Sequence, residues 1–237
     1  MLDDSAVERV LCVMAHPDDV DFGLAGTVAS WTDTGIEVSY CMITSGDAGG
    51  FDPSVPREAI AGIREREQTA AAKEVGVTDL RFLGYPDGQL EVSLGLRRDI
   101  SRVIRQVRPQ RVVCQSPERN WERIYGSHPD HLAAGEATMC AVYPDSRNPF
   151  TFVDTIGDLE AWTVNEVWIS SAGKANHYVD ITKQFERKKQ ALMRHESQIE
   201  SAESLHNILH FWNGGNAQAA GLPEGSYAEA FWVMDVT

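Results

Sequence analysis

Short apolar runs alternate with amphipathic stretches along the first 143 residues of the chain. The apolar runs are rich in β-branched residues, which is typical of strands buried on both faces, and the stretches between them contain good helix formers. Strands are predicted at residues 9–15, 37–43, 79–83 and 111–115, and helices at residues 24–34, 57–75, 94–107 and 132–142. This alternation predicts an α/β fold, a Rossmann-like three-layer α/β/α sandwich with a mostly parallel sheet.

The pattern is weaker in the last third of the chain. Strands are predicted at residues 164–169, 178–180 and 228–234, and a helix at residues 182–195. A chain of 237 residues has an ordinary size for one domain. We therefore expect a single domain over residues 1–237, in which residues 1–143 form the core and residues 144–237 pack on the sheet edge and cover the pocket.

Acidic residues outnumber basic ones, with 35 Asp and Glu against 21 Lys and Arg and a formal net charge of −14. This surplus disfavours binding to nucleic acids or to an anionic membrane surface, because both need clustered cations. No apolar run approaches the roughly 20 residues that span a bilayer, and the start Met1-Leu2-Asp3-Asp4 lacks the basic region of a signal peptide. A cytoplasmic location and neutral, cationic or metal ligands are expected.

Two His-Pro-Asp motifs follow strands of the predicted sheet. The motif that begins at His16 comes directly after the first strand, and the one that begins at His128 follows the fourth strand after a loop. Ligands of open α/β sheets bind beyond the carboxyl ends of the strands. A single His-Pro-Asp is more often a turn, but two copies at this edge favour a metal site, because imidazoles and carboxylates are the ligands of catalytic zinc.

These motifs also match a known family. Ala15-His16-Pro17-Asp18-Asp19 together with His128-Pro129-Asp130-His131 resembles the zinc-dependent N-deacetylases of the LmbE-like, or PIG-L, family. The resemblance covers most of the chain and continues through residues 44–50, 64–67, 83–88, 179–182 and 195–198.

Carried over to the matching positions, the family pattern makes His16, Asp19 and His131 the ligands of Zn²⁺ or of another divalent metal. It makes Asp18 the general base and His128 the electrostatic stabiliser or general acid. The chemistry agrees with these roles, because amide hydrolysis needs a polarised carbonyl, a base for the attacking water and a donor beside the developing oxyanion.

Three more residues are assigned through the resemblance. Asp130 would orient His131 or His128 from behind the metal site. Arg64 and Asp87 would contact hydroxyl groups of a sugar substrate. Structural roles stay open for both, because Arg64 lies in a mixed charge run typical of a solvated helix face and Asp87 lies in a Pro-Asp-Gly turn.

The chain departs from the family pattern at Val20, where many members carry Glu. Any task of that Glu is either absent here or passes to Asp21. Trp121 and Tyr125, in the loop before the second motif, are candidates for stacking on a sugar ring. His195 is expected to pack in the core or behind the site, and the pair His206 and His210, spaced like helix neighbours without a metalloprotease Glu, is expected to be structural.

The favoured hypothesis is a zinc-dependent hydrolase that removes an N-acetyl group from a small N-acetylglucosamine-like substrate. One alternative is an amidase that cleaves a larger acyl group from an amino-sugar conjugate. The other is a non-catalytic Rossmann-like metabolite-binding protein in which the two motifs are only turns. The apolar run at residues 230–234 suits either the core or the interface of a homo-oligomer.

Overall fold

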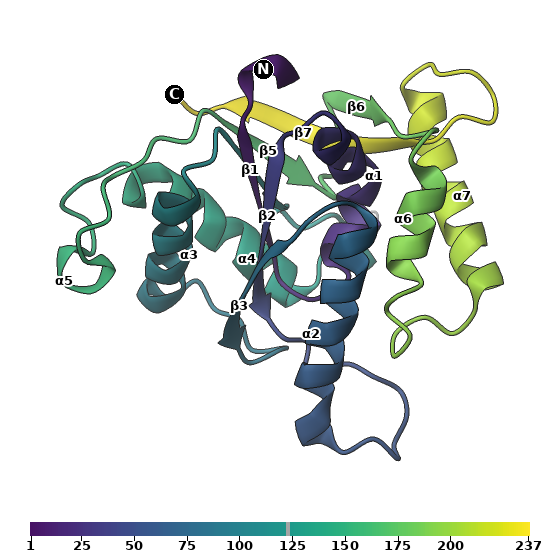
Figure 1. Ribbon diagram of the computed structural model, residues 1–237, viewed down its shortest axis with the longest axis horizontal. Coiled ribbons are helices and arrows are strands. Elements are labelled where there is room, and N and C mark those ends of the chain that lie inside the picture. Colours follow the sequence, from purple (N-terminus) through teal and green to yellow (C-terminus); the bar gives the residue numbers. More distant parts are fainter. Residues whose placement is uncertain (122–123) are drawn as a thin grey trace.

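The computed structural model describes residues 1–121 and 124–237, and the strands of these residues form one sheet in the order β3-β2-β1-β4-β5-β7-β6 (Figure 1). The strands are β1 (Arg9–Met14), β2 (Glu37–Thr44), β3 (Asp79–Tyr85), β4 (Arg111–Gln115), β5 (Glu166–Ser170), β6 (His177–Asp180) and β7 (Ala228–Asp235). Strands β1 to β5 pair in parallel, whereas β7 runs antiparallel to both β5 and β6. The predicted Rossmann-like fold with a mostly parallel sheet is confirmed.

Helices cover both faces of the sheet (Figure 1). One face carries α1 (Asp19–Asp33), α2 (Arg57–Glu74), α6 (Phe185–Leu192) and α7 (Ala202–Ala219), and the other carries α3 (Leu94–Val107), α4 (Pro129–Cys140) and the short α5 (Val153–Ile156). Each face of the sheet packs against its helices in a separate hydrophobic core, and strand β1 contributes to both. Cys12 and Met14 pack on the α1 side, and Leu11 and Val13 pack on the α4 side. Burial on both faces explains why the central strands are continuous apolar runs.

Two helices begin earlier than predicted, and each begins at one of the two His-Pro-Asp motifs. Helix α1 begins at Asp19 rather than at residue 24, and Leu24 marks a kink inside it. Helix α4 begins at Pro129 rather than at residue 132. Polar and charged residues in both first turns interrupt the apolar pattern, so that pattern missed them, yet acidic residues and an initial proline suit a helix N-terminus. Asp19 and His131 therefore lie in the first turns of their helices.

The last third of the chain adds β5, β6 and β7 to the same sheet. The predicted helix over residues 182–195 is shorter and spans Phe185–Leu192. Helix α7 was not predicted, because it contains a Gly-Gly pair and exposes apolar residues such as Phe211, which blurs its pattern. Over the residues described, no helix has the length and apolar character that a membrane span would require.

Candidate metal centre

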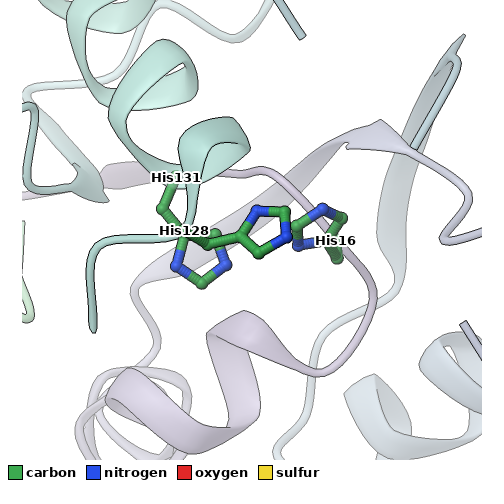
Figure 2. Close-up of side chains that lie close together, drawn as sticks. All are labelled: His16, His128 and His131. Atoms are coloured by element: carbon green, nitrogen blue, oxygen red, sulfur yellow. The ribbon is translucent and has the colours of Figure 1, made fainter. Parts of the chain in front are cut away.

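The two His-Pro-Asp motifs meet at the carboxyl ends of β1 and β4. Figure 2 shows His16, His128 and His131 directed toward one another, the first from the turn before α1 and the other two from the start of α4. Their ring centroids are 5.0 to 5.2 Å apart. The parallel topology thus brings together side chains that are far apart in the sequence, as predicted.

Asp19 links two of these imidazoles. Its Oδ1 lies 3.0 Å from His131 Nε2, and its Oδ2 lies 3.2 Å from His16 Nδ1. Burial raises the pKa of Asp19, but His131 and His16 outweigh that effect and hold it well below its usual range. The three predicted ligands therefore form one contiguous group of two nitrogens and a carboxylate. A nitrogen of His128 lies close enough to those of His16 and His131 to make it a fourth candidate ligand.

The far side of His16 faces two further carboxylates. His16 Nε2 lies 2.9 Å from Asp87 Oδ1 and 3.2 Å from Asp130 Oδ2. Burial lowers the pKa of His16, yet Asp19 and Asp87 together raise it to about 11. Carboxylates in this position fix the tautomer of a metal-binding imidazole, because they hold the proton on Nε2 and expose Nδ1.

The predicted partner of Asp130 was wrong. Its side chain contacts His16, and its two oxygens also accept the main-chain N–H groups of Gly88 and Leu90. The reason is geometric: Asp130 is buried at the first turn of α4 and faces the sheet and the loop after β3. Its interaction with His128 is through the main chain, since the Asp130 N–H donates to His128 Nδ1.

The site gathers more negative than positive charge. Four largely buried carboxylates, those of Asp18, Asp19, Asp87 and Asp130, are compensated only by the Arg64 guanidinium, which contacts Asp18, and by His16, whose raised pKa favours its cationic form. Burying such a surplus of negative charge is costly unless a cation compensates it. Imidazole nitrogens beside carboxylate oxygens are the donors that zinc prefers. The residues present therefore fit a divalent metal ion.

Asp18, the predicted base, sits in strained backbone beside this group. Its φ of 86° lies in the left-handed region, which is unfavourable for a residue with a Cβ. Its Oδ2 accepts a hydrogen bond from Arg64 Nη2 at 2.9 Å. Burial and the neighbouring Asp19 raise the pKa of Asp18 to about 6.

Arg64 and Asp87, the predicted substrate contacts, both bind residues of the site, since Arg64 contacts Asp18 and Asp87 contacts His16. Arg64 is buried, so the solvated helix face is wrong, and its guanidinium also donates to the carbonyl oxygens of Pro17 and Gly46. A Cβ at Gly46 would overlap that guanidinium. Asp87 contacts His16 with one oxygen and accepts the Ala48 N–H with the other. Contact of either residue with a substrate stays a prediction.

His128 caps α4 and is exposed. Because its Nδ1 accepts the Asp130 N–H, the proton of the neutral ring lies on Nε2, which can donate to another group. Burial, together with the charges of His16 and His131, lowers the pKa of His128. The geometry suits a hydrogen-bond donor at the open side of the site.

Comparison with known proteins agrees with this geometry. The family model described as "PIG-L: GlcNAc-PI de-N-acetylase" matches residues 11–142, which span both motifs. The chain belongs to the PIG-L family. It is 35% identical over 193 residues to the diacetylchitobiose deacetylase of Thermococcus kodakarensis, covering 81% of this chain and 71% of that protein.

Two more PIG-L family proteins match nearly the whole chain. A probable N-acetyl-α-D-glucosaminyl L-malate deacetylase 2 of Bacillus anthracis is 30% identical over 232 residues, which cover 95% of this chain and 94% of that protein. The solved structure of N,N'-diacetylchitobiose deacetylase from Pyrococcus horikoshii, in complex with its inhibitor MPG, superposes with a TM-score of 0.85 at 30% identity. It covers 97% of this chain and 85% of the other.

This PIG-L family chain also holds buried polar residues behind Asp18 that sequence reasoning largely missed. Asp21 Oδ2 accepts from Gln68 Nε2 at 2.8 Å and contacts His195 Nε2 at 2.9 Å. Burial lowers the pKa of His195, but the hydrogen bond and charge of Asp21 raise it above its usual value. The expectation that His195 lies in the core or behind the site is confirmed. Gln68 follows Arg64 by four positions, a spacing that places both on the inner face of α2.

The remaining sequence candidates lie outside this group. Trp121 is 84% exposed, and the side chain of Tyr125 is outside the described residues. His210 Nδ1 lies 2.8 Å from the Tyr227 hydroxyl, and the His206 and His210 rings stack on α7. Within the described part of the chain, neither His206 nor His210 belongs to a group of side chains that could hold a metal.

Proposed function

We propose that the protein is a zinc-dependent hydrolase that removes the N-acetyl group of small N-acetylglucosamine-containing substrates. The observation that carries the proposal is the placement of Asp18 beside the group in which Asp19 joins His16 and His131. The names of the relatives support the substrate class, since each is a deacetylase of an N-acetylated glucosamine compound.

His16 through Nδ1, Asp19 and His131 through Nε2 would hold the zinc ion, and Asp87 and Asp130 would fix the His16 ring from behind. Bound zinc supplies Lewis acidity, which polarises the amide carbonyl and makes water more acidic. These ligands come from a strand end and two helix starts, which are rigid elements that preserve their relative positions.

Asp18 would act as the general base. Arg64 holds its Oδ2, which fixes the plane of the carboxylate and directs Oδ1 to take a proton from the attacking water. His128 would donate its Nε2–H to the carbonyl oxygen as that oxygen gains negative charge. Asp18 then returns the proton to the leaving nitrogen, because an amine leaves only in its protonated form.

The test measures bound zinc and released acetate with N,N'-diacetylchitobiose as the probe. We expect about one zinc per chain for the wild type and for Asp18→Asn, but a loss of turnover of about 10²–10⁴-fold in that variant, since only a base is removed. His16→Ala should lose the metal. The proposal fails if His16→Ala binds zinc like the wild type and Asp18→Asn retains full activity. Release of an acid other than acetate from a different amide would identify an amidase instead.

A further inference from the structure

Three buried side chains lie behind Asp18 and contact none of the proposed metal ligands. Gln68 comes from α2, Asp21 from α1, and His195 from the segment after α6, and the relative exposure of each is 0%. Hydrogen bonds connect them in series. His195 Nε2 contacts Asp21 Oδ2, which also accepts from Gln68 Nε2, and Gln68 Oε1 accepts the main-chain N–H of Asp18 at 2.8 Å. The chain of contacts ends on the residue proposed as the base.

The main chain of Asp18 needs external support. Its left-handed conformation is disfavoured by the Cβ, and its carbonyl accepts the N–H groups of Asp21 and Phe22 in the first turn of α1. The N–H of Asp18 points the other way, toward α2, and Gln68 accepts it. Main-chain restraint by Gln68 therefore complements the side-chain restraint by Arg64.

The amide of Gln68 works in only one orientation. Its two ends have nearly the same shape, but one accepts and the other donates, so a flipped amide would place a donor against the donor of Asp18. Asp21 excludes the flipped state because a carboxylate accepts and needs the Nε2 end of Gln68. His195, on the same Asp21 oxygen, holds that carboxylate in place.

We propose that His195, Asp21 and Gln68 form a hydrogen-bonded relay of positioning residues that sets the main-chain conformation of Asp18, and so the aim of its carboxylate. The inference rests on the proposed function, because it takes Asp18 as the base. It also assigns a role to Asp21, the acidic residue next to the position where this chain departs from the family pattern.

The experiment compares kcat and KM for zinc-loaded full-length variants on N,N'-diacetylchitobiose. Gln68→Met keeps the length of the side chain but removes both hydrogen bonds, so kcat should fall about 100-fold, with KM within about threefold and zinc still bound, as for a slightly misplaced catalytic group. His195→Leu should also lower kcat, whereas His195→Gln should stay within about fivefold of the wild type, because its amide can still donate to Asp21.

Glu166→Gln is the matched control, since it breaks a buried ion pair far from the site and should lower stability with kcat unchanged. A kcat of Gln68→Met within about twofold of the wild type, or equal kcat values for His195→Gln and His195→Leu, would overturn the relay. If the wild type releases no acetate, the proposed function has failed. Amide hydrogen exchange then tests separately whether Gln68 restrains the main chain of Asp18. Exchange at Asp18 should then be at least about tenfold faster in Gln68→Met while amides of β4 are unchanged, and unchanged exchange at Asp18 refutes the inference.

Discussion

The parallel strands of the sheet begin at one edge, the amino edge, and end at the other, the carboxyl edge. Both edges bury charged side chains, but they stabilise them in different ways. At the amino edge, the fully buried Arg111 lies between the rings of Trp31 and Trp168 and pairs with Glu166 at 2.7 Å. Asp4 contacts the same guanidinium from the surface. The amino edge thus contains a paired cation in ordinary backbone, a purely structural arrangement.

The carboxyl edge lacks this one-to-one pairing. Four carboxylates share the Arg64 guanidinium and the protonated His16, and Asp18 adopts a backbone conformation that its Cβ disfavours. Strain and unbalanced charge persist only where surrounding contacts over-determine them, and they cluster at functional sites. The comparison indicates that the fold tolerates buried charge readily, and that the imbalance at the carboxyl edge reflects its chemistry.

The largest effect on stability is expected at the amino edge. Glu166→Gln removes the buried charged partner of Arg111 and leaves it only the surface carboxylate of Asp4, and breaking a buried pair costs about 3–5 kcal/mol of unfolding free energy. Urea unfolding should show this loss, while kcat of the zinc-loaded variant stays at the wild-type value. A fall in kcat that parallels the loss of stability would show that the two edges are not independent.

Removal of zinc should have the next largest effect, and only the carboxyl edge should respond. At a free zinc concentration 100 times the Kd, binding to the native state adds about 2.7 kcal/mol to the unfolding free energy. Urea titrations with buffered zinc and with chelator should show this difference in the wild type and in Glu166→Gln, but not in His16→Ala. Equal stabilisation of His16→Ala would place the metal elsewhere.

Gly46→Ala should have a smaller effect on stability and a specific effect on activity. The φ of Gly46 is 65°, so alanine costs about 1–2 kcal/mol there, and its Cβ would displace the Arg64 guanidinium that holds Asp18. We expect kcat to fall about tenfold or more.

Gly35→Ala, at the amino edge, is the matched control. Gly35 also has a positive φ, of 90°, but no atom lies within 4 Å of the position of a Cβ. It should lose similar stability and keep full kcat. Equal kcat values for the two alanine variants would remove Arg64 from the positioning of the base.

The sequence predicted those parts of this picture that local patterns encode. Strands buried on both faces appear as apolar runs, and the parallel topology that they imply brings His16, Asp19 and His131 together. The partner of Asp130 depends on the loop that packs against it, and the role of Gln68 depends on the helix opposite its side chain. Local sequence patterns encode neither of these tertiary contacts. Helix α7 was missed because its buried residues are few and exposed apolar residues lie between them.

The smallest expected effect is a difference in pH dependence between the two edges. The pKa of His195 is raised from 6.5, because Asp21 favours the cation more than burial disfavours it. Its contribution to stability should therefore be complete below pH 6.5 and disappear as the pH rises through the higher pKa of the folded state. His195→Gln does not titrate, so the excess stability of the wild type over this variant should shrink with rising pH.

The amino edge provides the control for this titration. Arginine keeps its charge throughout the range, so the difference between the wild type and Glu166→Gln should stay constant from about pH 6 to pH 9. Urea midpoints of the three proteins over this range measure both differences. An advantage of the wild type over His195→Gln that grows with pH would mean that His195 is neutral in the folded protein, and would reverse the sense in which Asp21 and His195 stabilise each other.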